Sequence, residues 1–203
     1  MFLALREWSH LRAAPTKKEK MMKILRQMTF HAEPSEMVVG DKIKIKLTDG
    51  RKYTATAIDK NNKRILFIFD ECIAKRPMNE EGGTEGGYLE SDLREYLSEE
   101  FYNLIPAKLQ ARLIPDENGD ELYLLSLKEV CGCDENFDDC AGQLEFFKIR
   151  KNRVADYKND YAHWWLRDVV SSANFAIVNY SGHASSYSAS HAFGVRPAFA
   201  IKA

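Results

Sequence analysis

Residues 164–203 gather side chains that could recognise another molecule. Between Val169 and Val195 there is no acidic or basic residue apart from histidine, although 29% of the whole chain is charged. Small hydroxyls, amides and tyrosines offer contact area and hydrogen bonds at a low ordering cost. We therefore predict a ligand-contacting surface, against the alternative of ordinary surface polar residues. The predicted contacts are Asn174, Asn179, Tyr180, His183, Ser185, Tyr187, Ser188 and His191.

A second set of side chains could bind zinc. Cys131 and Cys133 are followed by Cys140 and, further along, by His163. Structural zinc sites are usually built from paired cysteines separated by two residues, and the single intervening Gly132 does not fit that spacing. Incidental thiols are therefore the favoured interpretation, and we predict no metal and no cofactor.

Hydrolytic chemistry is a weaker alternative. Ser185, His183 and Asp168 supply the residue types of a catalytic triad, but no nucleophile elbow is present. In a segment this rich in serine, a serine close to a histidine is expected by chance. We predict that the protein is not an enzyme.

Two apolar runs flank the polar segment and must position it. Trp164 to Asp168 and Gly194 to Ile201 read as buried strands, and Trp164 and Trp165 are predicted to form the core beneath the binding face. Arg167 and Arg196 could grip a carboxylate or phosphate. The favoured interpretation is structural, with each guanidinium satisfying backbone carbonyls or an acid such as Asp168. Alternation along residues 174–180 predicts one strand face with Asn174 and Tyr180.

The rest of the chain predicts an α+β fold. Residues 41–70 alternate like an antiparallel β-meander, with an Asp-Gly hairpin turn at residues 49–50. Residues 88–113 have apolar residues at helical spacing, residues 126–129 form a capping box, and residues 144–154 predict an amphipathic helix with Ile149 inside. Strands and helices are segregated along the chain rather than alternating. Residues 1–35 are predicted to be an N-terminal helical extension and residues 36–203 the main domain.

Composition narrows the class of partner. The net charge is −1, and no apolar run approaches the roughly 20 residues of a membrane span. These features argue against nucleic acid and membrane insertion as partners. The cysteines are unevenly spaced along the chain, which indicates a reducing compartment or the absence of structural disulfides. The N-terminus lacks the pattern of a signal peptide. We expect a cytoplasmic protein, and the family resemblance in the next paragraph adds a component of a phage particle as the alternative.

Three motifs carry a resemblance to a known family. They are residues 87–97 (GYLESDLREYL), residues 144–148 (LEFFK) followed by 152–154 (NRV), and residues 164–167 (WWLR) followed by 194–199 (GVRPAF). Together they resemble an uncharacterised domain family of bacteria and bacteriophages, frequent in gut Firmicutes and their prophages, over roughly residues 38–202. That family is similar in turn to the C-type lectin-like fold of formylglycine-generating-enzyme-type domains and of the variable proteins of diversity-generating retroelements.

The resemblance implies a binding function. In the variable proteins, C-terminal strands present a ligand-binding face that is diversified at adenine-rich codons, which the composition of residues 171–191 resembles. Formylglycine-generating activity needs a cysteine pair near the C-terminal strands, and no cysteine follows Cys140. We therefore predict a ligand- or receptor-binding module for a protein or glycan. The alternatives are a formylglycine-generating-type or zinc-dependent enzyme, and an assembly protein that forms homo-oligomers through residues 1–35.

Overall fold

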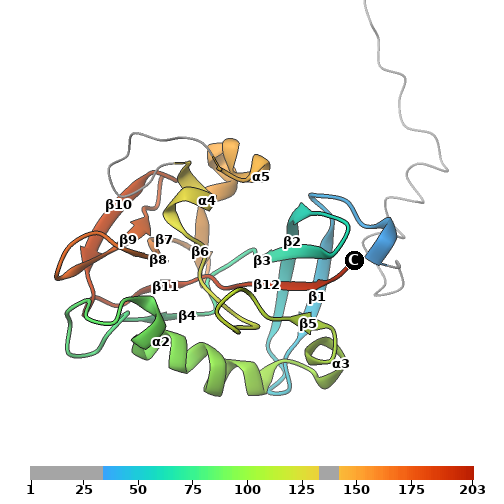
Figure 1. The fold of residues 1–203 in the computed structure, drawn as a ribbon, viewed down its shortest axis with the longest axis horizontal. Helices are drawn as coiled ribbons and strands as arrows, with labels where there is room; N and C mark the ends of the chain where they lie inside the picture. Colours follow the sequence, from blue (N-terminus) through green and yellow to red (C-terminus); the bar gives the residue numbers. More distant parts are fainter. Residues whose placement is uncertain (1–33, 133–141) are drawn as a thin grey trace, which may run out of the picture.

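The structure is a computed structural model that describes residues 34–132 and 142–203. The predicted helical extension, except for its last residues, lies outside the described residues, as do Cys133 and Cys140. Within the described part, two five-stranded sheets and several short helices surround a shared apolar core that runs from Met37 to Ile201 (Figure 1). The predicted α+β class is confirmed.

Sheet A contains the predicted meander. Its strand order is β1-β2-β3-β12-β5, and all of its pairs are antiparallel. The run of residues 65–69 is buried on both faces, which explains why it has no polar alternation. The strand bounds are β1 (Lys42–Lys46), β2 (Lys52–Lys60), β3 (Arg64–Phe69), β12 (Ala198–Lys202) and β5 (Leu113–Ile114).

Sheet B is built mainly from the tail of the chain. Its order is β10-β9-β8-β11-β4, and β11 lies parallel to β8 while the other pairs are antiparallel. A separate hairpin, β6 (Ala155–Tyr157) with β7 (Asp160–Ala162), lies between β4 and β8 in the chain. The bounds in sheet B are β10 (Ala184–Ser188), β9 (Asn174–Val178), β8 (Trp164–Val169), β11 (Phe193–Val195) and β4 (Ala74–Arg76).

Short helical turns fill the space between and beside the sheets. The predicted helical stretch of residues 88–113 is a series of such turns as far as Gln110, and its last residue, Leu113, lies in strand β5 instead. The predicted capping box begins α4, with Ser126 and Glu129 satisfying each other's backbone N–H groups. The bounds are η1 (Pro34–Glu36), η2 (Tyr88–Glu90), α2 (Asp92–Glu95), η3 (Tyr96–Phe101), η4 (Tyr102–Leu104), α3 (Ala107–Gln110), α4 (Leu127–Cys131), α5 (Glu145–Lys148) and η5 (Arg150–Arg153). None of the helices among the described residues has the length and apolarity needed to cross a membrane.

One helix prediction is wrong. Residues 144–154 form two turns, α5 and η5, because Ile149 between them adopts an extended backbone with φ −81° and ψ 103°. The helical periodicity that placed Ile149 in the core is broken at that residue, and its side chain is 63% exposed. Phe147, which precedes the break, is fully buried as predicted.

The chain passes from sheet B to sheet A at Arg196 and Pro197, between β11 and β12. Gly194 allows β11 to lie close against its neighbours, since a Cβ there would sit 2.5 Å from the Cys72 Sγ and 2.8 Å from the His163 carbonyl oxygen. Any side chain at this position would push β11 away from β8.

Candidate functional site

Five aromatic or imidazole rings form a continuous surface at the end of sheet B, which we call the aromatic patch. The patch consists of Tyr180, His163, Phe193, Tyr187 and His191. His163 lies 5.4 Å from Tyr180 and 5.1 Å from Phe193, measured between ring centroids. Phe193 lies 5.0 Å from Tyr187 and 5.2 Å from His191, and these last two rings are 4.5 Å apart.

A buried tryptophan supports the patch from below. The Trp165 ring is fully buried, and Phe193 meets it edge-on at 5.3 Å. Trp165 is fixed in turn by its strand pairing with Ile177 and by a 2.9 Å hydrogen bond that its Nε1–H donates to the Arg76 carbonyl oxygen. The base of the patch is therefore rigid.

The outer rings of the patch are open to solvent. The Tyr180 side chain is 58% exposed and the Tyr187 side chain 45% exposed, and His191 is also exposed. Large aromatic groups usually bury most of their area within the fold. Contiguous exposed apolar area of this kind is typical of interaction sites.

Electrostatics keep the centre of the patch neutral. The His163 Nδ1 is buried and has no hydrogen-bond partner among the described residues. Burial, together with the positive charge of Lys75, holds the pKa of His163 below its ordinary value. The imidazole is therefore uncharged near neutral pH and behaves as one more aromatic ring.

The structure divides the eight predicted contacts into groups. Tyr180, Tyr187 and His191 belong to the aromatic patch. Ser185 and Ser188 lie half-buried on β10, which is the edge strand beside the patch, and the Ser188 hydroxyl is 3.1 Å from that of Ser190. Asn174 pairs with Ser188 in the β9–β10 register and is half-buried.

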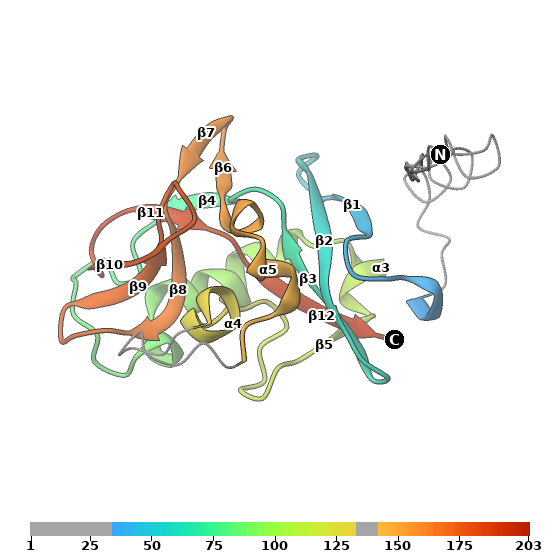
Figure 2. The ribbon, with the colours of Figure 1, turned by 90° about the horizontal axis from the view of Figure 1, so that it is seen from above.

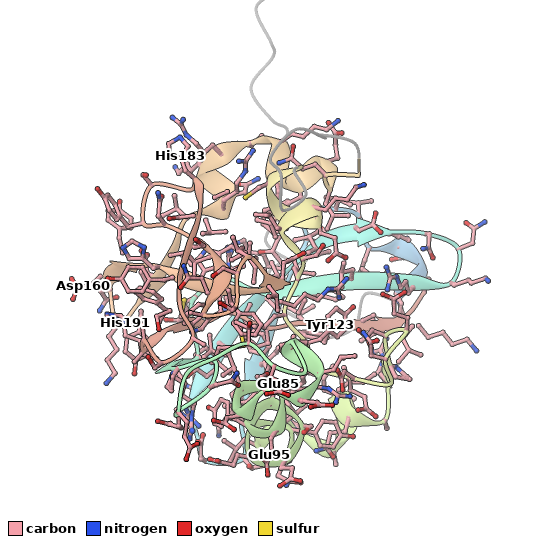
Figure 3. All side chains as sticks on the ribbon, turned by 60° about the vertical axis from the view of Figure 1, so that its left-hand side comes forward. Glu85, Glu95, Tyr123, Asp160, His183 and His191 are labelled. Carbon is pink, nitrogen blue, oxygen red and sulfur yellow. The ribbon has the colours of Figure 1, made fainter. Side chains whose placement is uncertain are left out.

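The other two predicted contacts shape a turn. The Asn179 side-chain oxygen accepts hydrogen bonds from the backbone N–H groups of Ser181 and His183 at 2.9 and 3.1 Å. The His183 ring lies 3.0 Å from a guanidinium nitrogen of Arg150. Figure 3 places His183 well away from His191. The predicted strand face also ends early, since β9 stops at Val178 and Tyr180 follows it in the turn.

Sequence reasoning missed the ring that joins the patch together. Phe193 was not among the predicted contacts, and His163 was considered only as a zinc ligand. Phe193 contacts four other rings, those of His163, Trp165, Tyr187 and His191. The sequence signal that could have identified Phe193 is its position, directly before the motif of residues 194–199 and directly after the polar segment.

The arginines and tryptophans of the two motifs hold the framework. Arg196 is buried, its Nε–H donates to the Phe69 carbonyl oxygen at 2.8 Å, and its guanidinium lies 5.1 Å from the Trp164 ring centroid. Trp164 donates from Nε1 to the Arg153 carbonyl oxygen at 2.8 Å. The Arg167 guanidinium lies 3.5 Å from the Glu129 carboxylate. These contacts join sheet A, the helical turns and sheet B.

The triad and zinc alternatives gain no geometric support. The Asp168 carboxylate accepts a 2.5 Å hydrogen bond from the Leu127 N–H at the start of α4, while His183 faces Arg150. Over residues 34–132 and 142–203, no group of three or more His, Cys, Asp and Glu side chains is placed to hold a metal ion. Cys131 is buried in the core.

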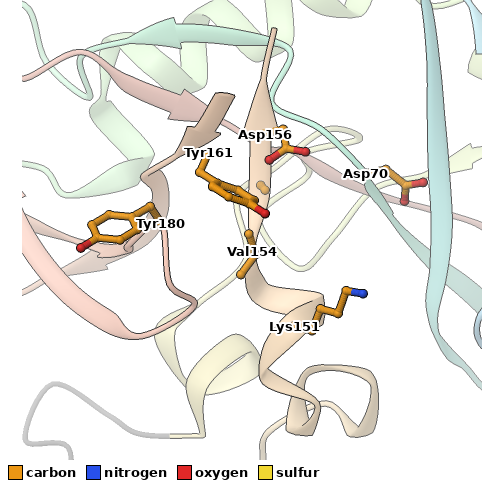
Figure 4. A pocket seen from close by; sticks show the side chains of 7 residues that line it. Asp70, Lys151, Val154, Asp156, Tyr161 and Tyr180 are labelled. Atoms are coloured by element: carbon orange, nitrogen blue, oxygen red, sulfur yellow. The ribbon is translucent and has the colours of Figure 1, made fainter. Parts of the chain in front are cut away.

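A pocket of about 450 Å³ adjoins the aromatic patch (Figure 4). Tyr180 belongs to both features. The lining residues are Asp70, Lys151, Val154, Ala155, Asp156, Tyr161 and Tyr180. The pocket extends from the patch to the β6–β7 hairpin, so a ligand bound in the pocket would touch the edge of the patch.

The fold and this surface define an α+β protein with an exposed aromatic surface beside a polar pocket. The chain belongs to the family described as Domain of unknown function (DUF6273), whose profile matches residues 61–203. The match begins after β2 and includes all of sheet B, the hairpin and the pocket-lining residues. Searches of curated proteins and of solved structures give no significant match.

Proposed function

We propose that this protein is a ligand- or receptor-binding module that engages a protein or glycan through the aromatic patch. The observation that carries the proposal is the exposure of Tyr180 and Tyr187 on a base made rigid by Trp165. Rigid aromatic anchors supply contact area at a small entropic cost, and such residues dominate the energetics of many interfaces. Ser185 lies two residues before Tyr187 on β10, hence on the same strand face, and its hydroxyl can add a hydrogen bond beside these anchors.

The proposal extends to the fold and its biological setting. We propose a C-type lectin-like arrangement, supported by the tail motifs and by the C-terminal segment supplying strands to both sheets. We also propose that the protein is encoded by a phage or prophage and is diversified along residues 171–191. An experimental structure tests the fold. A near-repeat of the codons for residues 171–191, beside a reverse-transcriptase gene, tests the diversification.

Binding to cell surfaces tests the function directly. Fluorescently labelled protein is added to a panel of intact gut bacteria and to printed glycans, and bound fluorescence is measured against protein concentration. We expect saturable binding to a subset of the surfaces. A Tyr187→Ala/His191→Ala double variant should bind about thirtyfold more weakly, because each lost anchor contributes on the order of 1 kcal/mol.

The control variant is Val38→Ala, which shortens an exposed apolar side chain in the segment between η1 and β1, the edge strand of sheet A. It should bind as the native protein does. Binding by the double variant that equals that of the native protein would show that the patch is not the binding surface. The absence of saturable binding to every surface would contradict the module itself.

A further inference from the structure

The β6–β7 hairpin projects from the body of the protein beside sheet B (Figure 2). Its two-residue turn is formed by Lys158 and Asn159, both with positive φ, 54° and 71°. This geometry is that of a type I′ turn, which matches the twist of the two strands and fixes their register. At its base, Ala155 pairs with Ala162 and both are buried. The hairpin is therefore a defined platform.

The two faces of the hairpin have different surroundings. On one face, Tyr157 pairs with Asp160, and its ring is covered by the ammonium groups of Lys75 and Lys158 at 5.4 and 5.1 Å. On the other face, Asp156 pairs directly with Tyr161. That second face lines the pocket, and the Tyr161 side chain is 72% exposed.

The pocket brings several unpaired polar groups together. Asp156 and Lys151 are both exposed, and within the part of the chain that the structure describes neither side chain forms a hydrogen bond or an ion pair. The Asp70 carboxylate is already engaged, since Lys42 donates to it at 2.5 Å and the Thr56 hydroxyl also donates to it. Asp156 and Lys151 are thus an acceptor and a donor that remain available to a ligand.

Two tyrosine rings lie in the same pocket. Figure 4 shows Tyr161 between Tyr180 and Asp156 in this view. Val154 and Ala155 supply the apolar part of the lining. Aromatic faces beside hydrogen-bonding groups offer a ligand both an apolar and a polar contact.

We propose that this pocket binds a neutral pyranose sugar, with one face of the sugar ring on Tyr161 and its hydroxyls bonded to Asp156 and Lys151. A pyranose has a C–H face that packs on an aromatic ring and hydroxyls that both donate and accept. This inference rests on the proposed binding function and deepens it, because it names the class of ligand at the edge of the aromatic patch.

Charge balance distinguishes a sugar from other ligands. The charged residues of the lining are Asp70, Asp156 and Lys151. Just outside the lining, Lys42 pairs with Asp70, and both Glu71 and Arg196 interact electrostatically with Asp70 and Asp156. The acidic groups in and around the pocket are therefore matched by basic ones. An organic cation would be favoured by an excess of carboxylates around the rings, and an anion by an excess of basic groups. A balanced set with free donors and acceptors favours a neutral ligand with several hydroxyls.

Titration by NMR with small probes tests the proposal. The probes are methyl α-D-glucopyranoside, methyl β-D-galactopyranoside and methyl N-acetyl-β-D-glucosaminide, with tetramethylammonium chloride and inorganic phosphate for comparison. We expect at least one glycoside to shift the ring signals of Tyr161 and Tyr180, with a millimolar Kd as suits an open pocket. Tyr161→Ala and Asp156→Asn should each weaken that binding about tenfold.

The hairpin supplies a matched control. Asp160→Asn makes the same chemical change as Asp156→Asn, but at a residue of the opposite hairpin face that does not itself line the pocket. It should leave glycoside binding within about twofold of the native value. Equal weakening by the two asparagine variants would overturn the proposal, since it would show an effect of hairpin charge rather than a contact. Thermal unfolding of each variant verifies that it is folded.

Other results would also overturn the sugar assignment. Shifts caused by tetramethylammonium and lost in Asp156→Asn, with no response to the glycosides, would identify a cation site. No response to any glycoside at tens of millimolar would exclude a neutral sugar. The proposed function is tested separately, because loss of cell binding in the Tyr187→Ala/His191→Ala variant involves no pocket residue. Cell binding that depends on the patch but not on Asp156 would uphold the module and reject the sugar.

Discussion

Aromatic rings form a contact network in each of the two sheets. The network of sheet A is buried, whereas that of sheet B leads from a buried ring to exposed ones. In sheet A, Phe67 stacks on Phe199 at 5.3 Å, Phe69 meets Phe199 edge-on at 5.7 Å, and all three rings are fully buried. In sheet B, the contacts begin at buried Trp165 and end in solvent at Tyr187. The first network contributes packing energy alone. The second uses a packed base to hold rings that the fold itself does not bury.

This difference predicts which substitutions affect stability and which affect binding. Truncating a ring in sheet A leaves a cavity, because the surrounding core closes only in part. Truncating an outer ring of the aromatic patch mainly removes surface area that is already in water. The following predictions test this separation.

The largest effect is expected for Phe199→Ala. The ring lies between Phe67 and Phe69 in the centre of sheet A, so its removal should lower the free energy of unfolding by about 3–5 kcal/mol. Urea unfolding followed by tryptophan fluorescence measures the change. Binding by the fraction that remains folded should be unchanged. A loss below about 1 kcal/mol would mean that the sheet A network is not the main source of packing energy.

A smaller loss is expected where the two regions are joined. Arg196→Met removes the donors that bond to the carbonyl oxygens of Phe69 and Asn152, at 2.8 and 3.2 Å, and leaves the first acceptor buried and the second part-buried. Unpaired buried carbonyls are unfavourable, whereas losing a buried charge is favourable, so we expect a net loss of about 2 kcal/mol.

Arg196→Lys is the matched variant for that prediction. It keeps the positive charge but cannot reproduce both hydrogen bonds of the planar guanidinium. Chemical denaturation should therefore place it between the native protein and Arg196→Met. A lysine variant less stable than the methionine variant would show that the buried charge, rather than the lost hydrogen bonds, dominates at this junction.

Sheet A was largely predictable from the sequence, whereas the aromatic patch was not. Residues 65–69 are apolar on both faces because the strand is central, and a capping box such as Ser126 with Glu129 is a local pattern. Phe193, by contrast, contacts rings from separate parts of the chain, and no helical or strand periodicity in the sequence links those parts. Asn179 was assigned to binding, although an asparagine at the start of a Gly-containing turn often accepts a hydrogen bond from the backbone N–H two residues on, as it does here from Ser181.

The buried imidazole at the centre of the patch predicts a dependence on pH. His163 has a lowered pKa in the folded protein, so the unfolded chain binds more protons just below the ordinary histidine value of about 6.5. Its contribution to stability is complete above that pH and is lost as the pH falls toward the folded-state pKa. His163→Phe should remove this part of the pH dependence.

Thermal unfolding of both proteins between about pH 7.5 and pH 5 measures the effect. The difference in stability between the native protein and His163→Phe should move in favour of the variant as the pH falls. Ligand binding through the patch should weaken over the same range, because a charged imidazole would replace a neutral ring. Parallel stability curves for the two proteins would show that His163 is not the titrating group.

The smallest effect on stability is expected at the outermost ring, and a matched pair of variants shows it best. Tyr187→Ala should change the free energy of unfolding by no more than about 0.5 kcal/mol, because nearly half of that side chain is already in water. Tyr53→Ala makes the same change in sheet A, where the ring is half-buried and meets Phe69 edge-on at 5.7 Å. Its loss should be about 2 kcal/mol. Ligand affinity should show the opposite pattern, since only Tyr187→Ala should weaken binding. Equal stability losses for the two variants would mean that the fold uses the Tyr187 ring as it uses the rings of sheet A, and the outward direction of the sheet B network would then have no functional meaning.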